Sequence, residues 1–110
     1  MNSRRKGARG EREWAAWLRR VLGVEARRGQ QYSGLGGRDV VSSLPIHWEV
    51  KRTEALSLYP AVEQAVRDAA EDEVPVVAHR RSRREWLLIL RAADLLRLVE
   101  AVKGRKNEDS

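Results

Sequence analysis

The sequence predicts one mixed α/β domain spanning residues 1–110, in which a central five-stranded sheet is flanked by helices. Segments with apolar residues on one helical face occur at 11–23, after Pro60 and at 92–103. Short runs rich in β-branched and aromatic residues lie between them, three before Pro60 and two after it. This order of helix, three strands, helix, two strands and helix is typical of a sheet covered by helices.

The first helix is expected in "EREWAAWLRRVLG", with Gly23 as its C-cap. The apolar residues that recur at the spacing of one helical face are Trp14, Trp17, Leu18, Val21 and Leu22. A short strand, "VEARR", follows and leads into the glycine-rich loop "GQQYSGLGGR". The next strand is expected from Asp39 through Ser42, after which "SLP" turns the chain back.

The third strand, "IHWEVKR", has two chemically different faces. Its apolar face carries Ile46, Trp48 and Val50, and its other face carries His47, Glu49 and Lys51. The apolar face is expected to pack in the core. Charged side chains on an inner strand are costly unless they find partners or an ion.

The second half of the chain is expected to form a helix, two strands and a last helix. Pro60 suits the first turn of the helix, whose expected core face contains Val62, Ala65, Val66 and Ala69. "VPVVAH" and "EWLLIL" are expected as two buried strands, joined by an arginine-rich turn that includes His79. "AADLLRLVEAVK" is expected as the closing helix.

Composition narrows the classes of protein to consider. Hydrophobic residues make up 42% and charged residues 35%, which suits a globular protein with a charged surface and flexible ends at 1–6 and 104–110. The absence of cysteine excludes a disulfide framework and a thiolate zinc site. No apolar run approaches the roughly 18 residues of a membrane span, so we expect a cytoplasmic protein with no membrane partner.

The charge balance points to a polyanionic partner. Basic residues outnumber acidic ones by 22 to 16, a net charge of +6, and arginines cluster in "SRRKGARGER", "EARRG" and "HRRSRREW". Because arginine forms bidentate contacts with phosphate, nucleic acid is the leading candidate. The alternative is a charged surface that is merely solvated.

Acidic residues gather around the third strand. Glu49 and Lys51 point the same way, and a hairpin would place Asp39 beside them. Two carboxylates and a nearby backbone carbonyl, such as that of Val50, form an oxygen site suited to Mg²⁺, and Lys51 can stabilise charge on a phosphate. An ordinary cross-strand ion pair is the alternative. Helical geometry also turns Glu11 inward, either toward this site or as a charge that favours the helix dipole.

These residues carry a resemblance to a known family. "RKGARGERE" at 5–13, Asp39 after the glycine loop and "WEVKR" at 48–52 resemble, in order and spacing, the archaeal-type Holliday junction resolvases of the PD-(D/E)XK nuclease superfamily. The resemblance extends from about Arg5 to Leu98 and implies a restriction-endonuclease-like fold. It also implies a homodimeric endonuclease that cuts four-way DNA junctions with Mg²⁺, for which Mn²⁺ substitutes. Similar small proteins are common among phages, in which case the location would be the host cytoplasm.

The family's site residues carry over position by position. Its first glutamate falls on Glu11, its aspartate on Asp39, and its glutamate and lysine on Glu49 and Lys51. The resemblance thus implies that these four are catalytic, with Asp39, Glu49, Glu11 and the carbonyl of Val50 as metal ligands. The chain departs from the superfamily pattern at Arg38, which stands in the place of the proline.

Further residues are candidates for contacts with DNA. From the basic clusters, the glycine loop and the family pattern, they are Arg4, Arg5, Lys6, Arg12, Arg27, Arg28, Tyr32, Ser33, Arg38 and Arg52. His47 shares the charged face of its strand, but a hydrogen-bonding role at a solvated strand end is the alternative. Gln64 resembles a glutamine that some nuclease relatives place near the site, although helical geometry points it away from the expected core face.

Two other functions fit the same residues. One is a nickase or repair endonuclease of the same fold that acts on flaps or linear duplex. The other is a basic DNA-binding protein without catalytic activity. A resolvase must make two nicks related by an approximate two-fold, so we expect a homodimer whose interface uses the second or third helix.

Overall fold

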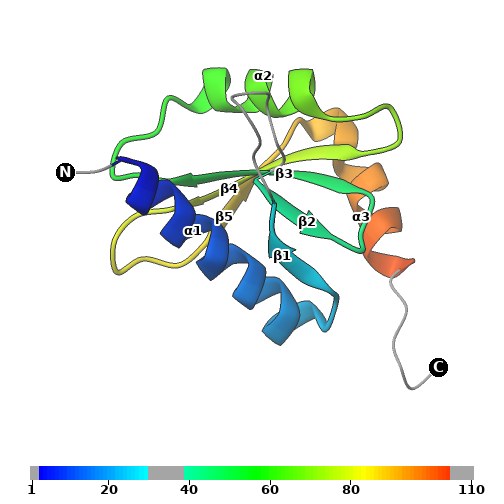
Figure 1. Ribbon diagram of the computed structural model, residues 1–110. Coiled ribbons are helices and arrows are strands. Elements are labelled where there is room, and N and C mark those ends of the chain that lie inside the picture. The colour runs from blue at the N-terminus through cyan, green and yellow to red at the C-terminus, as the bar shows by residue number, and fades with distance from the viewer. Residues whose placement is uncertain (1–2, 30–38, 105–110) are drawn as a thin grey trace.

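The protein is a mixed α/β domain with a five-stranded sheet flanked by helices, as the sequence predicts (Figure 1). The structure is a computed structural model that describes residues 3–29 and 39–104. The elements in chain order are α1 (Ser3–Trp17), the π-helical turn η1 (Leu18–Leu22), β1 (Ala26–Arg28), β2 (Val40–Ser42), β3 (Ile46–Arg52), α2 (Leu58–Asp68), β4 (Val74–Arg80), β5 (Leu87–Ile89), the 3₁₀ turn η2 (Ala92–Asp94) and α3 (Leu95–Lys103).

The sheet has the order β1-β2-β3-β4-β5, with β3 in the centre. Strands β1, β2 and β3 are joined in antiparallel fashion, and β5 pairs antiparallel with β4. Strands β3 and β4 are parallel, because α2 crosses over the sheet between them. Helices α1 and α2 lie on opposite faces of the sheet (Figure 1). Strand β3 is therefore covered on both faces.

The core on the α1 face is built around tryptophan. Trp14 is fully buried, stacks on Trp17 at a centroid distance of 4.8 Å, and meets Trp48 and Trp86 at 5.1 and 5.0 Å. Such aromatic pairs stabilise a core by more than the burial of their apolar area alone would provide. On the α2 face a smaller cluster joins Ala61 and Ala65 to Val77 of β4. The small alanine side chains allow α2 to lie close to the sheet.

The structure corrects several expected details. Helix α1 begins at Ser3, well before the expected start at residue 11, since its arginines favour a helix. Val21 is 51% exposed, because the chain changes from an α-helix to a π-helical turn at Leu18. Strand β5 is an edge strand, and its first two side chains, Leu87 and Leu88, are exposed rather than buried.

Other expectations lie wholly or partly outside the description. Residues 1–2 and 105–110, where flexible ends are expected, and most of the glycine-rich loop, 30–38, are outside the described residues. Within the described ranges, no helix combines the length and the apolar character needed to cross a membrane.

Candidate functional site

Asp39 stands at the start of β2, beside the middle of β3. The antiparallel pairing of Val40 with Trp48 brings the side chain of Asp39 to β3. There, Oδ2 of Asp39 accepts a hydrogen bond of 2.8 Å from the Val50 N–H. The backbone carbonyl of Asp39 accepts a second one, of 3.0 Å, from the Gly29 N–H on its other side. The backbone of Asp39 is thus held by the segment of Gly29, and its carboxylate is held by β3.

The electrostatic surroundings of Asp39 disfavour its charged form. The pKa of Asp39 is raised from 3.8 to about 7, chiefly by burial and next by the negative charge of Glu49 and Glu11, against the opposing effects of the Val50 N–H and Lys51. A carboxylate in a stabilising ion pair would have a lowered pKa instead. Asp39 is therefore a buried carboxylate whose charged form is further disfavoured by the two neighbouring glutamates.

Glu49 lies at the centre of the charged face of β3, below α2. Its side chain is buried, with Oε1 lying 3.2 Å from His47 Nε2 and Oε2 lying 3.7 Å from Lys51 Nζ. Lys51 donates a 2.9 Å hydrogen bond to Gln64 Oε1 on α2. The ammonium of Lys51 is therefore held between a carboxylate and an amide oxygen.

Glu11 reaches the same region from α1 and is buried, as helical geometry predicts. Its Oε1 accepts a 2.7 Å charge-assisted hydrogen bond from Arg28 Nε on β1. The preceding residue, Gly10, allows α1 to approach β3, because a Cβ at this position would lie 2.5 Å from Arg52 Cβ. This close approach carries Glu11 toward Asp39, on whose pKa its charge acts.

The structure thus brings Glu11, Asp39, Glu49 and Lys51 together, as the sequence predicts. Two expectations were wrong. His47 is 4% exposed, not at a solvated strand end, because β4 and α2 cover this part of β3. Gln64 does not point away from the site: the buried face of the helix contains Ala61 as well as the expected Ala65 and part of Val62, which turns Gln64 toward Lys51.

The sequence reasoning missed Asp68, one helical turn after Gln64. One ligand atom each from His47, Glu49 and Asp68 lie within 4.8 Å of one another, the only such group of three among residues 3–29 and 39–104. Glu11 and Asp39 are not part of this group: Glu11 accepts a hydrogen bond from Arg28, and Asp39 accepts one from Val50. The spacing of Gln64 and Asp68, i and i+4 on one helix, is the signal that relates them.

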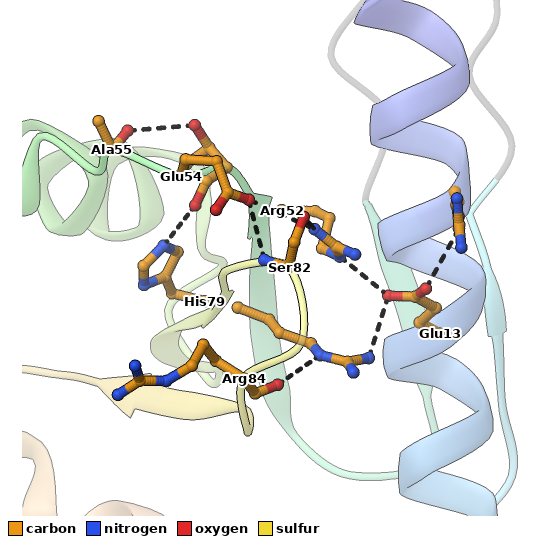
Figure 2. A network of polar contacts seen from close by, with 10 residues as sticks. Glu13, Arg52, Glu54, Ala55, His79, Ser82 and Arg84 are labelled. Carbon is orange, nitrogen blue, oxygen red and sulfur yellow. Dashed lines mark hydrogen bonds and ion pairs between the residues drawn. The ribbon is translucent and has the colours of Figure 1, made fainter.

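The candidate DNA-binding residues have different surroundings. Arg12, Arg27 and Arg28 are exposed, and Arg28 also binds Glu11. The side chain of Arg52 is only 11% exposed and is bound by Glu13 and Ser82, so it offers little surface to a nucleic acid (Figure 2). The other candidates have side chains outside the described part of the structure; they are Arg4, Arg5, Lys6, Tyr32, Ser33 and Arg38.

A second polar network, also missed from the sequence, lies beside the carboxylates at the end of β3. Glu13 on α1 binds Arg52 at 3.1 Å and Arg80 at 3.4 Å (Figure 2). Arg52 also donates to Ser82 in the turn between β4 and β5. These contacts tie α1 to the end of the sheet where Lys51 lies.

No protein family, no curated protein and no solved structure matches the chain.

Proposed function

We propose that the protein is a metal-dependent DNA endonuclease with a restriction-endonuclease-like fold. The observation that carries this proposal is the convergence of Glu11, Asp39 and Glu49 beside one lysine, with the pKa of Asp39 raised to about 7. Ion pairs that serve only stability leave their carboxylates compensated. Here a positive charge is missing, and titratable groups perturbed in this way are concentrated at functional sites.

All the donors of the proposed site are oxygen atoms, which a hard divalent cation prefers, although the group whose ligand atoms lie within 4.8 Å of one another among the described residues is His47, Glu49 and Asp68. Oδ2 of Asp39 is used by Val50, while Oδ1 has no hydrogen-bond partner among the described residues. Asp39 and Glu49 would hold Mg²⁺, or Mn²⁺ in its place, with the Val50 carbonyl as a further ligand and Glu11 completing the shell. When bound, the cation would neutralise charge on the phosphate and activate water.

The chain's own residues supply position and charge. Gln64 and Glu49 orient the Lys51 ammonium, which would stabilise the negative charge that develops on the phosphate oxygens. His47 holds Glu49 from the other side. A water molecule would add to phosphorus while the bond to the leaving sugar oxygen breaks, giving one phosphate end and one hydroxyl end without a covalent intermediate.

The substrate we propose is the four-way DNA junction, because the motifs of the chain resemble those of junction resolvases. Two nicks require two sites, so the active form would be a homodimer. Apolar side chains suited to an interface lie exposed on α2, β5 and α3; they are Leu58, Tyr59, Leu87, Leu88, Leu95, Leu96 and Val99. Helix α3 packs beside β4, whereas α2 also carries Gln64, the hydrogen-bond partner of Lys51, so an interface on α3 would leave the site more accessible than one on α2.

A panel of branched and linear DNAs in Mg²⁺ or Mn²⁺ tests this proposal. We expect paired nicks in four-way junctions, and we expect Asp39→Asn to bind the junction without cutting it. Cleavage of flaps or linear duplex with intact junctions would indicate a nickase or repair endonuclease instead. Binding without cleavage of any DNA, unchanged by Asp39→Asn, would indicate a non-catalytic DNA-binding protein.

A further inference from the structure

The turn between β4 and β5 forms a basic cavity that the proposed catalytic site does not use. The cavity has a volume of about 270 Å³, and its lining residues are His79, Arg80, Arg81, Arg84, Glu85 and Leu87. Three arginines and one glutamate are therefore among its lining residues. The side chains of Arg81 and Arg84 are exposed.

The positive charge of this cavity is poorly compensated. Arg84 lies 3.7 Å from Glu85, but both side chains are about 70% exposed, so water weakens the pair. The side chain of Arg81 has no acidic partner within residues 3–29 and 39–104. Arg80 shares one carboxylate, Glu13, with two other arginines. A phosphate group would find surplus charge and planar donors suited to its oxygens.

The backbone of the turn is held firmly in place (Figure 2). The Ser82 N–H donates to Glu54 Oε2 at 2.8 Å, and Arg80 Nε donates to the Arg84 carbonyl at 2.6 Å. Arg83 adopts a left-handed conformation with φ of 62°, which costs free energy in a residue other than glycine. The arginines thus project from an ordered turn, so a ligand would not have to order the backbone on binding.

The cavity adjoins the strand that carries Lys51. His79, which lines the cavity, is the register partner of Lys51 on the neighbouring strand. Adjacent strands lie only about 4.8 Å apart. Figure 1 shows the β4–β5 turn at the same end of the sheet as the end of β3 and the start of α1. A nucleic acid strand lying across this end would pass both the cavity and the lysine.

We propose that this cavity binds a backbone phosphate of the nucleic acid on which the carboxylate site acts. The inference rests on the proposed function for its nucleic acid partner, and it adds a phosphate contact formed by Arg81 and Arg84 with Arg80 at its base. It implies a contact that is independent of base sequence and that is weakened by salt.

The test compares two double variants that remove the same charge. Arg81→Ala/Arg84→Ala removes two positive charges from the cavity, while Arg20→Ala/Arg67→Ala removes two exposed arginines, one from η1 and one from the last turn of α2. Binding of a short labelled duplex and of a four-way junction is measured in EDTA over a salt series, so that no cleavage interferes. We expect the cavity variant to bind about tenfold more weakly and the slope of log affinity against log salt to fall by about one to two.

The control variant is expected to stay within about twofold of wild type. Equal binding by the two double variants would overturn the proposal. The proposal would also be overturned if the cavity variant lost binding of inorganic phosphate or of a mononucleotide but kept its binding of DNA, because the cavity would then serve a free ligand. If wild type cuts no DNA in Mg²⁺ or Mn²⁺ but the cavity variant still binds DNA more weakly, the phosphate contact stands and the nuclease proposal fails.

Discussion

Replacement of Asp39 by asparagine should make the metal-free protein more stable while it abolishes cleavage. The asparagine oxygen can still accept the hydrogen bond from the Val50 N–H, which is 2.8 Å long in the wild type. The substitution removes a charge that burial, Glu49 and Glu11 all disfavour. A residue that costs stability in the absence of its ligand is typical of a binding or catalytic site.

The size and pH dependence of the effect follow from the pKa of Asp39. A rise from 3.8 to about 7 means that the fold prefers the protonated form. The stability that this proton contributes is complete below pH 4 and is lost as the pH rises through 7. The full shift in pKa corresponds to about 4 kcal/mol in the free energy of unfolding. Because Asp39 is only half-buried, solvent screening reduces this contribution to about 2 kcal/mol. The variant should therefore melt about 10 °C above wild type at pH 8 and near it at pH 4.

Thermal melting at several pH values, with and without Mg²⁺, tests this reasoning. Added Mg²⁺ should raise the Tm of wild type at pH 8 more than at pH 5, where protons compete for the carboxylates, and should not raise that of Asp39→Asn. If Asp39→Asn melts below wild type in EDTA at pH 8, Asp39 is a stabilising group and the argument for a cation site fails.

Asp94 offers a matched control within the same chain. It is also buried, but hydrogen bonds from Arg91 and Arg97 outweigh the desolvation that would raise its pKa and hold that pKa below 3.8. A lowered pKa contributes stability above the unfolded-state value and loses it as the pH falls. Asp94→Asn should therefore lower the Tm at pH 8, the opposite of Asp39→Asn, whereas a rise in both variants would show a general effect of removing acidic charge from the protein.

Further predictions concern the groups that position the site. Gln64→Ala should slow cleavage about tenfold with little change in DNA affinity, because Lys51 loses its 2.9 Å hydrogen-bond acceptor; single-turnover kinetics checks this, and an unchanged rate would remove Gln64 from the site. Gly10→Ala should destabilise the protein by about 1–3 kcal/mol, because the new Cβ would lie 2.5 Å from that of Arg52. Gly7→Ala, whose Cβ would meet nothing within 4 Å, should instead stabilise α1 by about 0.5–1 kcal/mol. Urea unfolding compares the two variants, and equal effects would contradict the close approach of α1 to β3.

The parts of the site that the sequence predicts correctly obey local rules. Alternation along β3 places Glu49 and Lys51 on one face, and a short hairpin brings Asp39 beside them. Helical periodicity likewise turns Glu11 inward. Each of these relations depends only on the geometry of one element or of two consecutive ones.

The parts that the sequence predicts wrongly depend on packing between distant segments. Gln64 reaches Lys51 because Ala61, which the expected core face omitted, is buried with Ala65 against Val77 of β4. Leu87 and Leu88 are exposed because β5 is at the edge of the sheet, which its apolar sequence does not reveal. The three-arginine network around Glu13 joins residues up to 67 positions apart and has no local pattern.

The balance of charge differs between the polar networks of this protein, and the difference bears on function. Around Asp94 and around Glu13, each carboxylate meets two or three arginines, as expected in a chain with a net charge of +6. Around Asp39, the basic side chains that contact the three carboxylates within residues 3–29 and 39–104 are Lys51 and Arg28, with His47 beside Glu49. Selection for charge pairing alone would not favour a shortage of positive charge at a half-buried position between β2 and β3. A divalent cation would supply that missing charge, and the basic cavity beside Lys51 would hold the phosphate backbone next to it.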